Sequence, residues 1–342
     1  MPHRTFLAFI FPSVAAMLLF IALPLLSIAY QSLYIQHPKV LADMQVCDPF
    51  GCIVESEIDT EAMANINATA PAGRFNGLGT YVNQAHLATA EMRHIWRQAP
   101  TVKIALAQTL NLPFYRALAF TLAYTIVVTP LSILLGFLIA LAADALPRAW
   151  IGAISYITML PMIVPSLLGA LVLFWMIDSR GIIGAALRTV LQDPSLSLKT
   201  SPTLSWITLF VYGVWASAPY VFIVLYAGLQ TVPRDTLESA MIDGASRWAR
   251  LRHVVGPHLR SLVTLLIVVG IMDNFRVFES IIGLSASANA SSLSILIFTD
   301  LMTNEAPLFG SAAASSMLTI LGIAILMLPA IVRSWKDFRQ KA

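Results

Sequence analysis

The sequence has few charged residues and almost no cysteine. Only 11% of its 342 residues are charged and 58% are hydrophobic, whereas soluble domains carry roughly 25% charged residues. A soluble protein of this length would lack the polar side chains needed to cover its surface. Several apolar runs also exceed the roughly 20 residues that cross a bilayer as a helix. The composition therefore predicts an all-α membrane protein.

Motifs for nucleotide, metal or acyl chemistry are absent. The sequence contains no Gly-x-x-x-x-Gly-Lys-Ser/Thr, His-Glu-x-x-His or Gly-x-Ser-x-Gly pattern. The histidines fall in segments expected to be water-facing loops or span ends. Only Asp273 and Glu279 are carboxylates within a predicted span, which is too few for a proton relay. We expect no catalytic residue, metal or cofactor in this chain, so transport energy would come from elsewhere.

The two cysteines are Cys47 and Cys52. They lie five residues apart in a segment that we place outside the cytoplasm, where a disulfide would close a small ring. Two free thiols without a role are the alternative. Metal binding is less favoured because no histidine lies at ligand spacing.

Hydropathy predicts six spans. The first is longer than the apolar core of a signal peptide, and we expect it to be retained. The spans cover residues 6–34, 114–143, 150–177, 204–229, 261–284 and 309–332.

The distribution of lysine and arginine predicts the orientation. Cationic residues are denser in the short loops and ends on one side, and such loops stay in the cytoplasm. We therefore expect both termini and residues 230–260 in the cytoplasm, and residues 35–113 on the outer side. The whole chain, 1–342, is expected to form a single transmembrane domain.

Prolines interrupt the third span. Pro161 and Pro165 each remove a backbone donor, so we expect a kink or a break there. Freed carbonyls at membrane depth can be satisfied in a polar cavity. Proline is also common in ordinary membrane helices, so the pattern by itself supports a solute pathway only weakly.

Polar residues share one face of the fourth span. Gly213, Ser217 and Tyr220 are spaced i, i+4, i+7. Such a face suits either a wall for a hydroxyl-rich solute or helix packing through small residues. The spacing does not choose between them.

The fifth span ends with Asp273, Asn274, Arg276 and Glu279. Asp273 and Arg276 are close enough along a helix for an ion pair. We expect that pair to be structural, and Asn274 to be the better candidate for solute contact.

A charged segment between two apolar runs carries the clearest motif. It reads Glu238-Ser-Ala-Met-Ile-Asp243-Gly244-Ala245-Ser246-Arg247-Trp248, and Pro257 follows. We expect Glu238 and Asp243 early in a helix, where acids complement the dipole, and the arginines later. Gly244 would permit a sharp bend.

This segment resembles the cytoplasmic coupling motif of type I ABC importer permeases. The resemblance implies six core spans and short helices that dock in a cleft of an ATPase subunit. It assigns that role to Glu238, Ala240, Asp243, Gly244, Ala245, Arg247 and Pro257. Ser239 stands where the family usually has Ala, which is a small-for-small change.

Three further segments are similar to MalF-type permeases of carbohydrate importers. They are Phe75-Asn-Gly-Leu-Gly-Thr-Tyr81, Ala227-Gly-Leu-Gln-Thr-Val-Pro233 and Phe275-Arg-Val-Phe278-Glu279. The resemblance implies a substrate pathway at Ser166, Gly213, Ser217, Tyr220, Gly270 and Asn274, with Met162 beside it. The family commonly has a Gly-Gly-Pro loop where this chain reads Ser-Ala-Ser-Ala-Asn-Ala at residues 285–290. The outer gate is therefore expected to differ in shape.

The resemblance also implies the other subunits of a transport complex. It implies a channel-forming subunit of a bacterial inner-membrane importer for a sugar or sugar-like polyhydroxy solute, glycosides and glycerol derivatives included. Its partners would be a second homologous permease, two cytoplasmic ABC ATPases that bind ATP and Mg, and a periplasmic solute-binding protein. The alternatives are a polyamine or other small polar solute on the same machinery, or a secondary transporter driven by the proton gradient.

Overall fold

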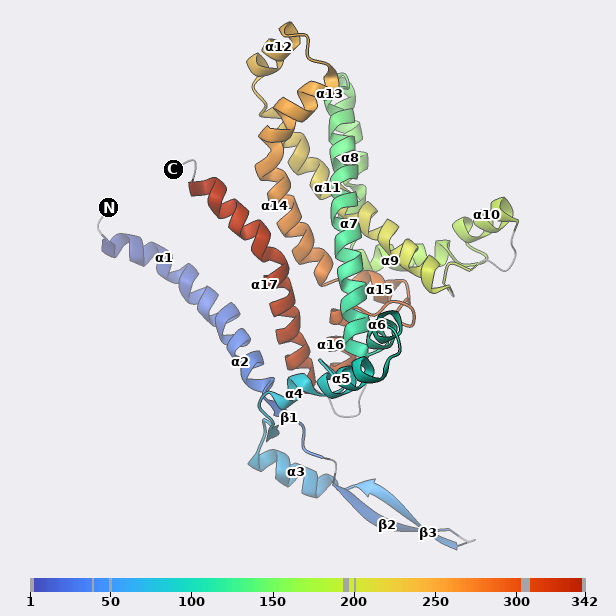
Figure 1. Cartoon of the computed structure of the whole chain (residues 1–342). Coiled ribbons are helices and arrows are strands. Elements are labelled where there is room, and N and C mark those ends of the chain that lie inside the picture. Colours follow the sequence, from blue (N-terminus) through green and yellow to red (C-terminus); the bar gives the residue numbers. More distant parts are fainter. Residues whose placement is uncertain are drawn as a thin grey trace. The chain divides into compact units, whose positions relative to one another are not determined.

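The computed structural model describes residues 3–38, 40–48, 51–192, 197–199, 201–302 and 308–339 (Figure 1). Five helices in these ranges are long and apolar enough to cross a membrane, and a bent helix pair would make a sixth span. They cover Ala8–Gln31, Pro113–Asp144, Pro202–Gln230, Arg247–Phe275 and Phe309–Val332, with Ala149–Ile163 and Ser166–Met176 as the bent pair. The predicted all-α membrane fold is confirmed.

The third span is broken, as its prolines predict. Helix α8 (Arg148–Ile163) and helix α9 (Ser166–Met176) meet at 92°. Val164 is extended because the ring of Pro165 disfavours the helical conformation in the residue before it. Pro161 lies inside α8 without ending it. Pro165 is therefore the proline that breaks the span.

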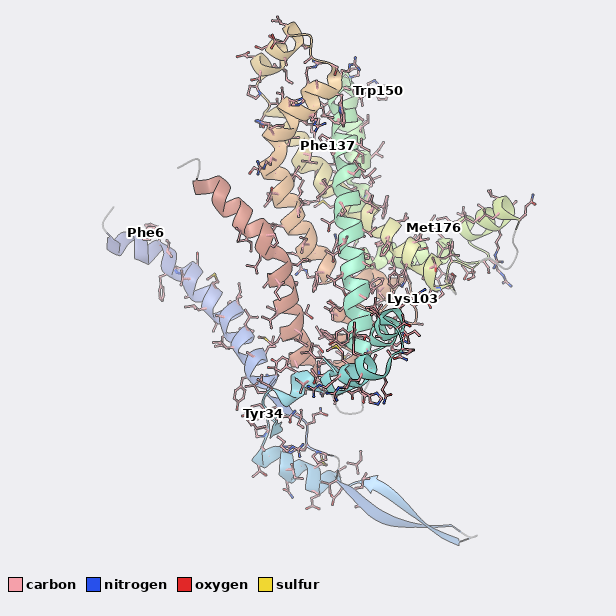
Figure 2. All side chains as sticks on the ribbon, viewed as in Figure 1. Phe6, Tyr34, Lys103, Phe137, Trp150 and Met176 are labelled. Carbon is pink, nitrogen blue, oxygen red and sulfur yellow. The ribbon has the colours of Figure 1, made fainter. Side chains whose placement is uncertain are left out.

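The chain divides into two compact units, Met1–Tyr115 with Leu296–Ile320, and Arg116–Ile295 with Leu321–Ala342. In the first unit, α1 (His3–Met17) and α2 (Leu23–Gln31) are joined by a π-helical turn at Leu18–Ala22. None of the apolar window of this helix is buried within the chain, and Figure 2 shows the exposed side chain of Phe6 on α1. Such a surface is typical of a helix that faces lipid.

The segment between the first two spans has structure of its own. Strand β1 (Tyr34–Ile35) pairs antiparallel with β4 (Arg74–Phe75), and β2 (Leu41–Asp48) forms a hairpin with β3 (Gly51–Ile58). Its helices are α3 (Thr60–Thr69), α4 (Gly79–Val82), α5 (Thr89–Gln98) and α6 (Val102–Leu110). Asp59 caps α3 by accepting bonds from the Glu61 and Ala62 amides.

The hairpin register places Cys47 opposite Cys52. A disulfide between them remains a prediction, since the two side chains lie outside the described residues.

His86 corrects the expectation that the histidines lie in water-facing loops or at span ends. Its side chain is 0% exposed. Its Nδ1 lies 2.7 Å from Asn83 Oδ1, and its Nε2 lies 3.0 Å from the Ser311 carbonyl oxygen. Ser311 Oγ in turn donates to Asp300 at 2.7 Å. The ring thus links the turn after α4 to α16 (Leu293–Met302) and the start of α17 (Phe309–Arg339), which sequence position alone does not reveal.

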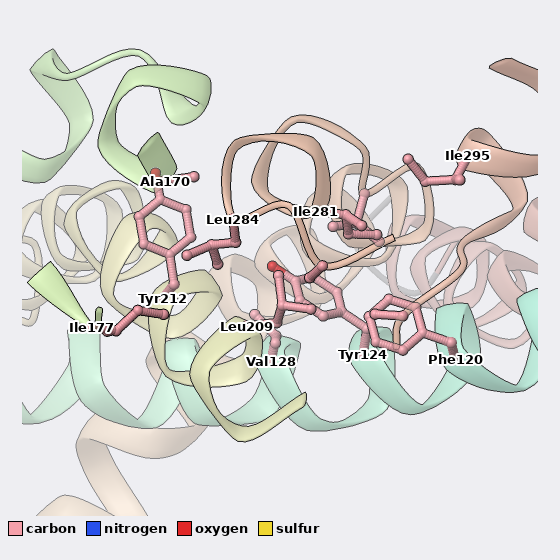
Figure 3. Packing of buried hydrophobic residues seen from close by; sticks show 13 residues of the cluster. Phe120, Tyr124, Val128, Ala170, Ile177, Leu209, Tyr212, Ile281, Leu284 and Ile295 are labelled. Carbon is pink, nitrogen blue, oxygen red and sulfur yellow. The ribbon is translucent and has the colours of Figure 1, made fainter. Parts of the chain in front are cut away.

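The core of the second unit lies between α7 (Pro113–Asp144), α11 (Pro202–Gln230) and the short helix α15 (Glu279–Gly283). Figure 3 shows Phe120 and Tyr124 of α7, Leu209 and Tyr212 of α11, and Ile281 of α15 in this cluster. A second cluster joins α7 and α11 to α14 (Gly256–Phe275) through buried residues that include Val221, Phe222, Leu225, Leu259 and Leu266.

The loop at residues 285–290 is hydrogen-bonded to neighbouring segments. Trp206 Nε1 donates to the Asn289 carbonyl at 2.9 Å, and Asn289 Nδ2 donates to the Lys199 carbonyl at 3.0 Å. Arg116 donates to the Ala288 carbonyl at 3.0 Å. Lys199 itself pairs with Asp178 at 2.6 Å, and its hydrogen bond lowers the pKa of that carboxyl to about 2. This loop therefore has a defined place without a Gly-Gly-Pro sequence.

Gly136 tests the packing of α7 on α11. A Cβ at Gly136 would lie 2.6 Å from Val221 Cγ1 and 2.9 Å from the Phe222 amide nitrogen, whereas a Cβ at Gly152 on α8 meets nothing within 4 Å. We expect Gly136→Ala to destabilise the chain by about 1–3 kcal/mol, because overpacking forces the helices apart. The matched Gly152→Ala should be neutral or stabilising by up to about 1 kcal/mol. Thermal unfolding in detergent measures both, and equal melting temperatures would contradict the packing.

Candidate functional site

A cavity of about 770 Å³ opens among the helices of the second unit. Its wall is built by α7, α8, α9, α11, α14 and the chain from Arg276 into α15. The lining is rich in hydroxyl, phenol and amide groups, with three charged side chains near one another in sequence. The polar and charged members are Tyr124, Ser132, Ser166, Tyr212, Ser217, Tyr220, Asp273, Asn274, Arg276, Glu279 and Ser280.

Every residue expected in the substrate pathway lines this one cavity. They are Met162, Ser166, Gly213, Ser217, Tyr220, Gly270 and Asn274. They come from α8, α9, α11 and α14. Met162 and Ser166 flank the break at Val164, so the proline that ends α8 also brings a new helix start to the cavity wall.

The predicted face of α11 is present. Gly213, Ser217 and Tyr220 all face the cavity, and Tyr220 is exposed. A Cβ at Gly213 would collide with the hydroxyl of Tyr124 on α7. Gly213 therefore serves helix packing and the cavity together, because it lets a phenol from the neighbouring helix reach the wall.

A hydrogen bond to α7 fixes the side chain of Asn274. It is only 7% exposed, and its Nδ2 donates to Thr129 Oγ1 of α7 at 2.9 Å. A Cβ at Gly270 would lie 2.8 Å from Thr129 Cγ2. Gly270 thus makes room for Thr129, and Thr129 fixes the amide of Asn274 at the wall.

The expected ion pair between Asp273 and Arg276 is present. Arg276 Nη2 lies 2.9 Å from Asp273 Oδ1, and both side chains are exposed. Both also line the cavity, so the structural and the solute-facing roles are compatible. Helix α14 ends at Phe275, earlier than hydropathy predicts, and Glu279 begins α15.

Sequence reasoning missed several lining residues, among them Tyr124, Ser132 and Tyr212. The Tyr212 hydroxyl donates to the Ser166 carbonyl at 2.6 Å, beside the break between α8 and α9. A signal was available on α7. Its buried polar residues recur at helical spacing within an apolar run, at Thr121, Thr125, Thr129 and Ser132.

The charged segment forms two short helices, α12 (Arg234–Ile242) and α13 (Arg247–Arg250). Gly244 lies between them with φ +77°, so the expected bend is present. The Ala245 amide bonds to the Ala240 carbonyl at 2.9 Å, and the Gly244 amide bonds to the Met241 carbonyl at 3.0 Å. This is a Schellman motif, in which a left-handed glycine ends the helix.

The expectation that Glu238 and Asp243 lie early in the helix is wrong. Pro233 precedes the first residue of α12, so Arg234 and Asp235 occupy the first turn. Glu238 lies in the middle and Asp243 follows the last helical residue. The helix begins earlier because proline before the first turn costs it no hydrogen bond. The two acids therefore do not complement the dipole of α12.

The tip of this segment is apolar and exposed. Ile242 is 87% exposed and Trp248 is 69% exposed, on either side of Gly244. Pro257 lies in the first turn of α14, which follows a π-helical turn at Leu251–Val255. Large exposed apolar side chains on a charged loop are typical of a surface that a partner covers.

Among the residues that the structure describes, no group of three or more His, Cys, Asp or Glu side chains lies close enough together to hold a metal ion.

Comparison with known families identifies the chain's class. Residues 132–337 match the family described as "Binding-protein-dependent transport system inner membrane component". The chain belongs to this family. It is a multi-pass inner-membrane protein and a membrane subunit of a transporter, and its resemblance to type I ABC importer permeases is confirmed.

Curated relatives carry sugar-transport names. The chain is 27% identical over 210 residues to the trehalose/maltose transport system permease protein MalF of Thermococcus litoralis, covering 60% of this chain and 70% of the relative. It is 37% identical over 100 residues to the trehalose permease SugA of Mycobacterium tuberculosis, covering 29% and 33%. The maltodextrin permease MdxF of Bacillus subtilis is 28% identical over 232 residues, covering 62% and 53%. The chain thus spans only part of each relative.

A solved structure shows the same fold. A chain of a bacterial ABC transporter that imports the acidic polysaccharide alginate aligns with a TM-score of 0.60 at 19% identity. The alignment covers 81% of this chain and 97% of that one.

Thr129 is the residue whose removal tests the wall. We expect Thr129→Val to leave the Asn274 amide without its partner, at a cost of about 1–3 kcal/mol for an unsatisfied buried group. Thr129→Ser keeps the hydroxyl and should behave more like the wild type. Thermal unfolding of the two variants measures the difference. Equal stability of the Val and Ser variants would contradict the hydrogen bond as a structural support.

Proposed function

We propose that this chain is the channel-forming permease subunit of an ATP-driven, binding-protein-dependent importer for a sugar or sugar-like polyhydroxy solute. The observation that carries the proposal is the cavity at the two helix breaks. Seven residues expected in a sugar pathway, from four helices, line it together. The names of the curated relatives, which are trehalose, maltose and maltodextrin permeases, support the same class of cargo.

The chemistry of the lining suits a polyhydroxy solute. Serine hydroxyls and tyrosine phenols both donate and accept hydrogen bonds, and an amide does the same through two groups. The cavity offers these at Ser166, Ser217, Tyr220 and Asn274. Tyrosine rings also present apolar faces to the C–H faces of a sugar ring. Small-molecule sites place polar groups that fix the orientation of the ligand among apolar side chains, and this wall contains both kinds.

Energy would enter at the α12–α13 segment. The exposed Ile242 and Trp248 flank a rigid helix end at Gly244, and this surface would dock on a cytoplasmic ATPase. We place residues 230–260 and both termini in the cytoplasm, and residues 35–113 in the periplasm. ATP and Mg would be bound by two partner ATPase subunits, and a second homologous permease would complete the pathway. A periplasmic solute-binding protein would deliver the cargo.

A cationic cargo such as a polyamine is the second candidate. Glu279 lines the cavity without a cationic partner among the described residues, and this favours a solute with an ammonium group. Asp273 does not add to it, since Arg276 neutralises that carboxylate.

Two wall residues test the solute path. We expect Tyr220→Ala and Asn274→Ala to reduce ATP-dependent sugar uptake by the complete complex about tenfold or more, since each removes a hydrogen-bonding group worth about 1–3 kcal/mol when left unpaired. Tyr156→Ala on α8, exposed and outside the cavity lining, is the matched control. Wild-type uptake by both wall variants would contradict the path. Uptake that follows the proton gradient without the ATPase would favour a secondary transporter.

Gly244 tests the coupling segment. A β-branched residue at φ +77° costs roughly 1–2 kcal/mol, and a Cβ there meets nothing within 4 Å. We therefore expect Gly244→Val to weaken co-purification of the ATPase while membrane insertion stays normal. Gly244→Asn should retain the ATPase, since asparagine tolerates this conformation. Glu238→Lys should also weaken binding, with Glu61→Lys in the outer segment as its control. Normal ATPase binding by both single variants, Gly244→Val and Glu238→Lys, would contradict the coupling role of this segment.

A further inference from the structure

Three charged side chains line the cavity, and their charges do not sum to zero. Asp273 and Arg276 form an ion pair at 2.9 Å. Glu279 also lines the cavity, and among the described residues it has no oppositely charged partner. The lining that this chain contributes therefore carries net negative charge, concentrated at the start of α15.

Glu279 is placed to meet the solute. It is exposed, and its neighbours Phe278 and Ser280 also line the cavity. The carboxylate is close enough to Tyr212 on α11 to interact with it electrostatically. Leu209, Tyr212 and Ile281 belong to one buried cluster, so the short helix that carries Glu279 is anchored by packing. A fixed charge on an anchored helix acts on whatever enters the cavity.

The Asp273–Arg276 ion pair and the carboxylate of Glu279 differ in the ligand groups that they attract. Arg276 would attract anions if it were free, but its guanidinium donates to Asp273. An ionised carboxylate only accepts hydrogen bonds. Glu279 can therefore receive a hydroxyl or an ammonium group, and it repels a carboxylate or a phosphate. This repulsion acts at short range, because a solute in the cavity lies beside the carboxylate.

We propose that Glu279 is a specificity-determining residue of the cavity, which admits neutral and amino sugars and rejects sugars that carry a carboxylate or a phosphate. This inference rests on the proposed sugar path and adds the charge class of the cargo. It also separates this chain from its structural neighbour in the transporter of alginate, which is an acidic polysaccharide.

The test uses three disaccharides that differ at one carbon. They are maltose, the same sugar with its terminal 6-hydroxymethyl group oxidised to a carboxylate, and its 6-amino-6-deoxy counterpart. Binding of each radiolabelled sugar is measured by scintillation proximity on the complete membrane complex in nanodiscs, without the receptor, so that the permease alone sets the preference. The variants are Glu279→Gln and Glu279→Lys. Glu61→Gln, on exposed α3 in the outer segment, is the matched control.

We expect the wild type and Glu61→Gln to bind the carboxylate sugar at least about tenfold more weakly than maltose, as repulsion between like charges across a hydrated cavity predicts. Glu279→Gln should remove most of this difference, and Glu279→Lys should reverse it and weaken binding of the amino sugar. Asp273→Asn, which frees Arg276, is an independent second variant and should also improve binding of the carboxylate sugar.

The contradicting results are distinct. If Glu279→Gln and Asp273→Asn discriminate among the three sugars as the wild type does, Glu279 does not set the charge class, although sugar binding still stands. If the wild type binds the carboxylate sugar as well as maltose, the cavity does not select by charge and the role of Glu279 is wrong, while the proposed sugar cargo still stands. If the wild-type complex binds none of the three, the proposed sugar cargo itself fails.

Discussion

Backbone hydrogen bonding in a bilayer is the constraint on which this structure depends. A helix satisfies its own backbone groups, and lipid offers no partner for any that a break leaves free. This chain nevertheless interrupts two apolar helices, at Val164–Pro165 and at Arg276–Phe278. Residues on both sides of the two breaks line the same cavity. At both breaks, the irregular backbone thus lies beside a polar wall.

Small residues allow that polar wall to exist within a tightly packed bundle. Gly213 leaves room for the Tyr124 hydroxyl, and Gly270 leaves room for Thr129, which holds Asn274. Tyr212 reaches the carbonyl of Ser166 beside the first break. The polar groups are therefore positioned by helices that approach closely. The same glycines thus serve helix packing and shape the cavity wall, which explains why residue spacing alone could not choose between a packing role and a cavity role.

Local signals predicted much of the fold. Hydropathy located the spans, the backbone donors missing at Pro161 and Pro165 predicted a kink or a break in the third span, and Gly244 predicted the bend between α12 and α13. The placement of Glu238 and Asp243 was wrong because Pro233 sets the start of α12, so that Arg234 and Asp235 occupy its first turn. The burial of His86 and the cavity positions of Tyr124 and Tyr212 depend on contacts between distant segments. Such contacts leave no trace in a single sequence, although the buried hydroxyls along α7 were readable.

The central claim is that solute passes along the wall where the two helices break. Its most direct test is protection of a thiol at Ser217 in the complete transporter. With Cys47 and Cys52 replaced, the account predicts that saturating transported sugar slows the reaction of Ser217→Cys with a methanethiosulfonate reagent by about tenfold or more, since a bound ligand excludes the reagent from its site. The reaction of Trp215→Cys, an exposed position on α11 outside the cavity lining, should not change. A rate at Ser217→Cys that sugar leaves unchanged, in a complex that still transports, would contradict the account.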